Sequence, residues 1–294
     1  MNIKEVQPEI YQQFQLILQK NKLSHSYLFT GNFGTLDMAI FLAQSIFCQN
    51  KQDGVACLEC RSCRLVANRD FADLHILEAE GQTIKTDQVR SLQKIFTQSG
   101  FESEKQVVII DGAEKMHVNA ANSLLKSMEE PNNDIYIFLL AEEENLVLDT
   151  IKSRSQLFRF PRQSKYIKNI LIENDILPTT AEVVSHLANT IDEAYDLSKS
   201  SWFDDAMKIF AKFTDMLLVD KDAAYLSIAG LLVKFKEKKE QARAFSLITF
   251  YLSKKFPDLR AVDFLEKNLK AERMWKSNVN FQSCLEYIVL GESK

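Results

Sequence analysis

The chain has 294 residues, of which 46% are hydrophobic and 26% charged, and its net charge is −4. This composition is typical of a soluble globular protein with two or three domains, and the acidic balance excludes a protein whose whole surface binds nucleic acid. No apolar run reaches the roughly 18–20 residues of a membrane span. The first residues carry no basic-then-apolar signal, so we expect a cytoplasmic location and no membrane partner.

Predicted strands and helices alternate along the first part of the chain. The apolar pattern predicts a helix at residues 3–22, a strand at 26–30 and a helix from 38 to about 48. Further strands are expected at residues 73–77, 106–111, 135–140 and 156–160, with helices at 86–98, 119–130 and 146–151. Such alternation indicates an α/β domain with a parallel sheet, which we assign to residues 1–162.

A glycine-bearing turn joins the first strand to the next helix, which is the setting of a phosphate-binding loop. The pattern G-x-x-x-x-G-K-[ST] needs a lysine for the phosphates and a hydroxyl for Mg²⁺. This turn instead contains Gly31, Gly34, Thr35 and Asp37, with Leu36 about where the lysine belongs. Asp37 brings negative charge to the place of the phosphates. The turn is therefore either an ordinary strand–turn–helix or a nucleotide-binding fold that has lost its nucleotide chemistry.

Four of the five cysteines fall within sixteen residues, at Cys48, Cys57, Cys60 and Cys63. In a reducing compartment this clustering indicates a metal site before it indicates disulfides. Four thiolates close a tetrahedral shell and leave no position open for catalysis, so we predict a structural Zn²⁺ that holds residues 48–63 together. The alternative is a set of buried or redox-labile thiols. The fifth cysteine, Cys284, is expected to be a small core residue.

Acidic residues follow the β-branched run at residues 106–111, which reads as a central strand. Asp111 ends this run and Glu114 lies three residues later. In P-loop ATPases an aspartate at this strand end helps to hold Mg²⁺, and an adjacent acid can polarise water. One acidic pair after a strand is common by chance, so the pair alone is a weak signal.

After Pro161 no strand pattern returns. Residues 165–199 read as a few short helices. Longer helices are expected at residues 203–218, 223–236, 240–254, 262–275 and 281–290.

Several segments together resemble a known family. They are the strand entry at residues 23–31, the four-cysteine insertion, the segments at residues 107–116 and 119–131, and the tripeptide Ser153-Arg154-Ser155. These segments are similar to the bacterial clamp-loader subunits of DNA polymerase III, which are members of the AAA+ superfamily. In lacking the loop lysine, the chain resembles the delta-prime subunits among them. The family tripeptide ends in cysteine where this chain has Ser155.

The resemblance implies an AAA+ ATPase-like domain at residues 1–162 with a zinc module at 48–63. It also implies a small helical lid at residues 163–200 and an all-helical collar for oligomerisation at 201–294. The implied partners are the gamma/tau and delta subunits, the sliding clamp and, through the assembly, primed DNA. The chain would be a component of the DNA-directed DNA polymerase III holoenzyme.

The resemblance also implies a division of roles between two sites. No loop lysine is present, Asp37 is acidic, and residues 189–194 of the lid offer no arginine, so no ATP is expected at Gly31, Gly34, Thr35 and Asp37 or at Asp111 and Glu114. Arg154 would then serve as an arginine finger for ATP on a neighbouring subunit. The simpler interpretation of Arg154 is a surface residue before a strand.

Two other functions stay open at this point. One is an active clamp-loader ATPase with an unusual loop, in which Asp111 and Glu114 bind Mg²⁺ and water. The other is a zinc-dependent DNA-binding regulator, against which the acidic charge and the lack of a basic recognition helix argue.

Overall fold

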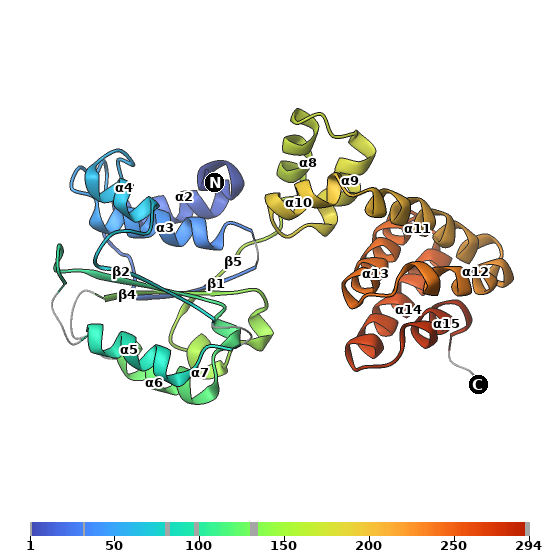
Figure 1. Ribbon diagram of the computed structural model, residues 1–294. Coiled ribbons are helices and arrows are strands. Elements are labelled where there is room, and N and C mark those ends of the chain that lie inside the picture. The colour runs from blue at the N-terminus through green and yellow to red at the C-terminus, as the bar shows by residue number, and fades with distance from the viewer. Residues whose placement is uncertain (1, 32, 80–82, 97–99, 130–134, 292–294) are drawn as a thin grey trace. The chain divides into compact units, whose positions relative to one another are not determined.

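The computed structural model describes residues 2–31, 33–79, 83–96, 100–129 and 135–291. It divides into two compact units, Met1–Gln163 and Ser164–Lys294 (Figure 1). The first unit combines a sheet with helices. In the second unit, all the described secondary-structure elements are helices. Among the described residues, no helix has the length and apolar character needed to cross a membrane.

The first unit is built on five parallel strands in the order β2-β3-β4-β1-β5. In chain order the strands are β1 Ser26–Thr30, β2 Leu74–Glu78, β3 Gln106–Asp111, β4 Ile135–Ala141 and β5 Gln156–Arg159. In the register, Leu28 lies beside Leu139 of β4 and Leu157 of β5. All five residues of β1 are buried, as expected for an interior strand covered on both faces. The α/β class with a parallel sheet is confirmed.

Helices cover both faces of this sheet (Figure 1). One face carries α1 Ile3–Val6, α2 Pro8–Gln19 and α3 Thr35–Phe47, and α4 Arg61–Ala67 packs on α3. The other face carries α5 Thr86–Phe96, α6 Val118–Glu129 and α7 Asp149–Lys152. Two short 3₁₀ helices, η1 Ala113–Lys115 and η2 Glu144–Leu146, follow β3 and β4.

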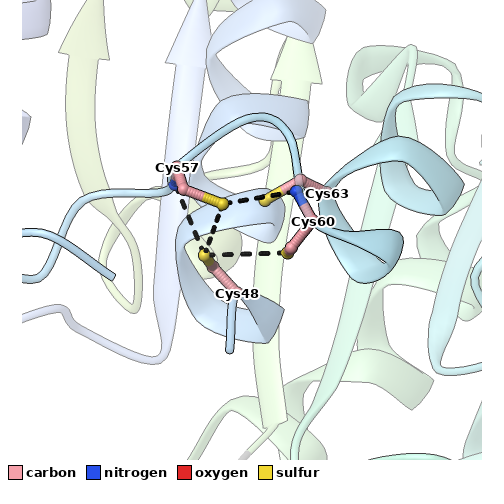
Figure 2. A group of neighbouring side chains, drawn as sticks. All are labelled: Cys48, Cys57, Cys60 and Cys63. Atoms are coloured by element: carbon pink, nitrogen blue, oxygen red, sulfur yellow. Dashed lines mark hydrogen bonds between the residues drawn. The ribbon is translucent and has the colours of Figure 1, made fainter. Parts of the chain in front are cut away.

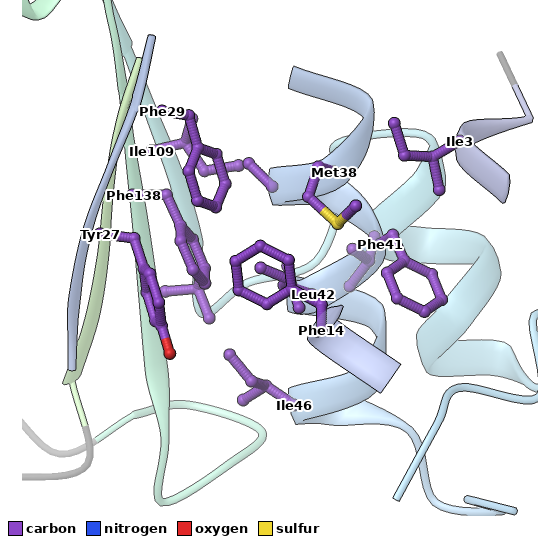
Figure 3. Close-up of a cluster of buried hydrophobic side chains, with 14 of the residues drawn as sticks. Ile3, Phe14, Tyr27, Phe29, Met38, Phe41, Leu42, Ile46, Ile109 and Phe138 are labelled. Atoms are coloured by element: carbon purple, nitrogen blue, oxygen red, sulfur yellow. The ribbon is translucent and has the colours of Figure 1, made fainter. Parts of the chain in front are cut away.

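Aromatic side chains dominate the core on the α2–α3 face (Figure 3). The ring of Phe14 lies 5.3 Å from that of Tyr27 and 5.6 Å from that of Phe29, between centroids. Phe138 of β4 stacks at 5.8 Å from Phe29. Each fully buried ring contributes about 1.5–3 kcal/mol by leaving water. This packing fixes the strand end from which the loop at Gly31 departs.

Some predicted boundaries were wrong. The single helix at residues 3–22 is two helices, because Pro8 begins α2 and the preceding Gln7 leaves the helical region (φ −134°, ψ 65°). Helix α4 was not predicted, since its seven residues follow directly on a cysteine turn. The predicted ends of α5 at residue 98 and of α6 at 130 lie outside the described residues, as does the proline at 131.

In the described part of the second unit, three short helices come first and five further helices follow, as the sequence predicted. The short helices are α8 Ser164–Glu173, α9 Pro178–Leu187 and α10 Ile191–Ser198. Four longer helices come next, α11 Ser201–Val219, α12 Lys221–Lys234, α13 Lys238–Ser253 and α14 Leu259–Lys276, and the last helix is α15 Phe281–Leu290. Cys284 is fully buried on α15, so its prediction as a core residue is confirmed.

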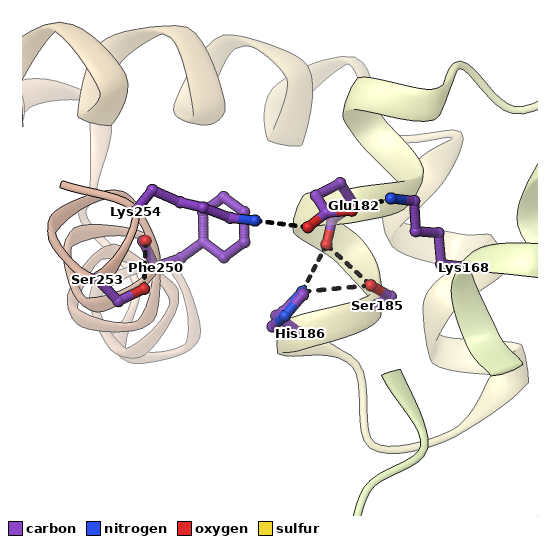
Figure 4. A network of polar contacts seen from close by, with 7 residues as sticks. All are labelled: Lys168, Glu182, Ser185, His186, Phe250, Ser253 and Lys254. Atoms are coloured by element: carbon purple, nitrogen blue, oxygen red, sulfur yellow. Dashed lines mark hydrogen bonds and ion pairs between the residues drawn. The ribbon is translucent and has the colours of Figure 1, made fainter. Parts of the chain in front are cut away.

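Glu182 of α9 ties the short helices to α13 (Figure 4). Its carboxylate accepts hydrogen bonds from Lys168 of α8 and, at 2.6 Å, from Lys254 of α13. The ammonium group of Lys254 also lies 5.3 Å from the ring centroid of Phe250. The hydrogen bonds from Lys168 and Lys254 lower the pKa of Glu182 to about 2.

Candidate functional site

The turn after β1 aligns with a phosphate-binding loop, position by position, once it is counted from Gly31. Leu36 falls at the second glycine, Asp37 at the lysine and Met38 at the hydroxyl position. The expectation that Leu36 stands about where the lysine belongs was therefore one residue off. Position 32 lies outside the described residues. Within this turn, both side chains that would contact a phosphate or Mg²⁺, the lysine and the hydroxyl residue, are replaced.

Protein side chains fill this turn. Phe33 and Met38 are buried, with 2% and 0% of their surface exposed. Gly34 takes the left-handed conformation (φ 87°) and caps α3, whose first residue is Thr35. At Gly31 a Cβ atom would stand 2.3 Å from the carbonyl oxygen of Phe160, so the chain passes too closely there for any side chain. The turn is therefore packed against protein at Gly31, Phe33, Gly34 and Met38, while Thr35, Leu36 and Asp37 stay partly exposed.

Gln7 seals the same turn from the break between α1 and α2. Its Nε2 donates to the carbonyl oxygen of Phe33 at 2.9 Å and to that of Pro161 at 2.8 Å. Its Oε1 accepts from Gln163 at 3.1 Å. Only 1% of Gln7 is exposed, and both N–H donors and the oxygen of its amide make hydrogen bonds. Three segments far apart in the sequence are therefore joined at the loop.

Asp111 and Glu114 lie at the same edge of the sheet as the loop, because both follow the carboxyl ends of parallel strands. Burial raises the pKa of Asp111, and the neighbouring charge of Glu78 adds to the effect. Burial also raises the pKa of Glu114, whose Oε2 has no hydrogen-bond partner among the described residues. With no lysine opposite, these acids meet no cationic group from the loop.

Arg154 lies at the opposite edge of the sheet. It sits between α7 and the first residue of β5, whereas the loop follows the last residue of the neighbouring parallel strand β1. A strand rises about 3.3 Å per residue, so four or five residues separate the two edges by roughly 15 Å. The side chain is 35% exposed. Arg154 therefore cannot reach the loop of its own chain.

Residues beside Arg154 and at the end of α6 are fastened to the start of β1. The ring nitrogen Nε2 of His25 lies 2.8 Å from the carbonyl oxygen of Met128, and the hydroxyl groups of Ser26 and Ser155 lie 3.2 Å apart. No local sequence pattern reveals this contact of His25, because it spans 103 positions. Ser155 also donates to the carbonyl of Ile151 at 3.0 Å.

The four cysteine sulfur atoms converge on one point (Figure 2). Cys48 caps the end of α3, Cys57 comes from the following loop, Cys60 caps the start of α4 and Cys63 lies in its first turn. The sulfur atoms all lie within 4.8 Å of one another, with Cys48 at 3.5 Å from Cys57 and 3.9 Å from Cys60. Zn–S bonds of about 2.3 Å in a tetrahedron place sulfurs about 3.8 Å apart. The cluster can hold a metal ion.

Backbone hydrogen bonds lower the pKa of these thiols, and burial raises it. A hydrogen bond from the backbone of Cys63 lowers the pKa of Cys60 to about 6, and backbone hydrogen bonds also lower that of Cys57. Burial raises the pKa of Cys48 and of Cys63. Since thiolates are the ligands, a cation at the centre would favour the deprotonated form of all four.

The cysteine cluster is remote from the loop at Gly31. Helix α3 begins at Thr35 and ends at Phe47, and thirteen helical residues span about 20 Å. The two features therefore form separate sites at opposite ends of one helix.

Residues 189–194, which offer no arginine, contain an acid that is already paired. Glu193 of α10 forms an ion pair with Arg243 of α13 and accepts a hydrogen bond from the backbone of Asn189 at 2.7 Å. Arg243 also donates to the carbonyl of Leu187 at 3.0 Å. The charge of Glu193 is therefore balanced within the second unit.

Asp73 has a structural role that the sequence did not indicate. It is fully buried, and its two carboxylate oxygens accept hydrogen bonds from the backbone of Phe101, Glu102 and Ser103 at 2.6, 2.8 and 2.8 Å. The local signal was only a single aspartate directly ahead of a strand. It anchors the loop between α5 and β3 to the edge strand of the sheet.

Comparison with known proteins agrees with these features. A family model described as DNA polymerase III, delta subunit, matches residues 6–164. The DNA polymerase III subunit delta' of Bacillus subtilis is 33% identical over 318 aligned residues, which cover 98% of this chain and 96% of that protein. The subunit delta' of Pseudomonas aeruginosa is 38% identical over 135 residues, 45% of this chain and 41% of that protein.

A more distant similarity extends to a related subunit. The DNA polymerase III subunit tau of Bacillus subtilis is 30% identical over 158 residues, 53% of this chain and 28% of that protein. The family model and the nearly full-length match to the Bacillus subtilis protein together decide the assignment. On this evidence the chain belongs to the family of DNA polymerase III delta' subunits.

Proposed function

We propose that this chain works in the DNA polymerase III clamp loader as a subunit that does not hydrolyse ATP. In this role it supplies Arg154 to ATP bound on a neighbouring subunit. The observation that supports this most directly is the position of Arg154, partly exposed at the sheet edge opposite its own loop. A guanidinium that meets transition-state charge in trans contributes on the order of 10³–10⁵ in rate.

The composition and packing of the chain's own loop support the claim that this subunit does not hydrolyse ATP. Asp37 replaces the lysine, Met38 replaces the hydroxyl residue, and Gln7 and Phe33 fill the turn. A phosphate approaching the start of α3 would meet the carboxylate of Asp37 and no lysine to balance its charge. Neither Asp111 nor Glu114 is then expected to act on a nucleotide.

The remaining assignments extend this proposal to the assembly. The partners are the gamma/tau and delta subunits, the sliding clamp and, through the complex, primed DNA, all in the cytoplasm. The cysteine cluster binds one structural Zn²⁺, which the sulfur distances support. We assign residues 1–162 to the ATPase-like domain, 163–200 to the lid and 201–294 to the collar.

Exposed apolar side chains on the longer helices support a collar that binds other subunits. Leu226 and Val233 of α12 lie seven positions apart, hence on one helix face, and are 77% and 68% exposed. Val219 at the end of α11 is 87% exposed. Large apolar residues grouped on a surface are typical of protein–protein contacts.

Two measurements test the proposal together. The isolated chain should show no ATP binding by calorimetry at millimolar nucleotide, and a clamp loader reconstituted with Arg154→Ala should lose a large part of its ATPase rate. Tight ATP binding by the chain alone would contradict the inactive loop and favour an active clamp-loader ATPase. An unchanged rate with the variant would exclude Arg154 as a finger.

A further inference from the structure

Arg154 does not extend freely into solvent. Its Nε donates to Oε1 of Glu129 at 2.5 Å, and its Nη2 forms an ion pair with the same oxygen. Its Nη1 lies 3.2 Å from the carbonyl oxygen of Thr150 and 3.2 Å from Oγ of Ser153. The guanidinium has five N–H donors; its contacts with described residues occupy four of them and leave one, on Nη2.

The backbones that carry this ion pair have a common anchor. Met128, next to Glu129, accepts from His25, and Ser155, next to Arg154, contacts Ser26. Since His25 and Ser26 are consecutive at the start of β1, the end of α6 and the end of α7 are held against one point of the sheet. Both sides of the ion pair are therefore fixed by contacts outside the pair.

We propose that Glu129 is a positioning residue for Arg154, holding the guanidinium in one orientation with a single N–H of Nη2 left for an anion on a neighbouring subunit. The proposal rests on the proposed role of Arg154 as an arginine finger. A long arginine side chain that is free must be ordered when it meets the phosphate, and this ordering slows the reaction. Glu129 achieves the ordering before the subunits meet.

The carboxylate of Glu129 also has an effect that opposes the benefit of ordering, because it reduces the net positive charge near Arg154. Both groups are partly exposed, at 35% and 49%, so water screens this charge strongly over the distance to a neighbour's phosphate. Orientation, in contrast, is not screened. We therefore expect the loss of Glu129 to slow hydrolysis.

The experiment uses the reconstituted clamp loader and measures the part of its ATPase rate that depends on Arg154. This part is the difference between the wild-type rate and the rate with Arg154→Ala. Glu129→Ala should lower the kcat of this Arg154-dependent part about fivefold to tenfold, which is the effect of ordering one long side chain. KM for ATP should stay unchanged. In the Arg154→Ala background, Glu129→Ala should have no further effect.

Two further variants separate positioning from folding. Glu129→Gln keeps an acceptor oxygen at the same reach and should retain at least half of the Arg154-dependent rate. Glu144→Ala is the matched control, because Glu144 forms a comparable surface pair with Arg159, at 2.6 and 2.9 Å, and should leave the rate unchanged.

Each other outcome has a distinct meaning. If Arg154→Ala lowers the rate and Glu129→Ala does not, the positioning role is wrong and the finger stands. If Glu129→Ala raises the rate, or lowers it equally without Arg154, or if Glu129→Gln is as impaired as the alanine variant, the inference is overturned. If Arg154→Ala itself has no effect, the proposed function fails first.

Discussion

The side-chain amide of Gln7 donates a 2.9 Å hydrogen bond to the carbonyl oxygen of Phe33, inside the turn that would hold phosphate in an active ATPase. The donor comes from a break between two helices near the start of the chain, and the acceptor comes from the turn after β1. Because this contact is almost completely buried, the turn is held in a filled conformation as well as lacking its lysine.

Restoring the lysine should therefore not restore nucleotide binding. We expect the double variant Asp37→Lys, Met38→Thr to bind ATP with a dissociation constant of about 1 mM or higher, since Phe33 and Gln7 still fill the turn. Calorimetric titration with Mg-ATP measures this directly. The triple variant that adds Gln7→Ala is the comparison, and micromolar binding by the double variant alone would show that the substituted charge was the sole defect.

Removing one cysteine ligand should abolish the proposed zinc site. The purified chain is expected to contain about one zinc ion per molecule, and Cys60→Ser to contain little or none, because a structural site needs its four ligands. Cys284→Ser is the matched control, since this cysteine is buried on α15 outside the cluster. Metal content is measured by plasma mass spectrometry. A folded wild-type chain without metal, at full thermal stability, would refute the structural role.

The loop anchored by Asp73 should detach when its carboxylate is removed. Asp73→Ala leaves three backbone N–H groups without their acceptor, which we expect to lower the free energy of unfolding by about 2–3 kcal/mol. Urea unfolding measures this change. The control is Asp70→Ala, an exposed carboxylate three residues earlier, which should change stability by less than about 0.5 kcal/mol. Equal losses in both variants would contradict the anchoring role.

The carboxylate of Glu182 should make the stability of the second unit depend on acidity. Its pKa is depressed to about 2 in the folded chain, so its contribution is present above the ordinary glutamate pKa near 4.3 and is lost as pH falls toward 2. Because the ion pairs are partly exposed, the contribution is about 1 kcal/mol.

The acid limb of the stability curve checks this expectation. Between pH 5 and about 2, Glu182→Gln should lose less stability than the wild type. Glu173→Gln, at the exposed end of α8, should behave as the wild type does. Identical curves for Glu182→Gln and the wild type would show that the pairs with Lys168 and Lys254 do not contribute.

The sequence alone determined the class of this protein. The alternation of strands and helices correctly predicted the parallel sheet, and the spacing of four cysteines correctly predicted that their sulfur atoms cluster. The missing loop lysine is read from the sequence directly, and the loss of nucleotide binding that it implies stays a prediction. Such signals are readable because hydrophobic period, ligand spacing and loop motifs are local properties of the chain.

The tertiary structure alone decided how the sites are held. Gln7 reaches Pro161 across 154 positions, His25 reaches Met128 across 103, and Glu129 reaches Arg154 across 25. No local pattern encodes such contacts, because they depend on which strand ends and helix ends the sheet order brings together. The filled turn and the held arginine follow from that order, and the sequence could state only which residues were present.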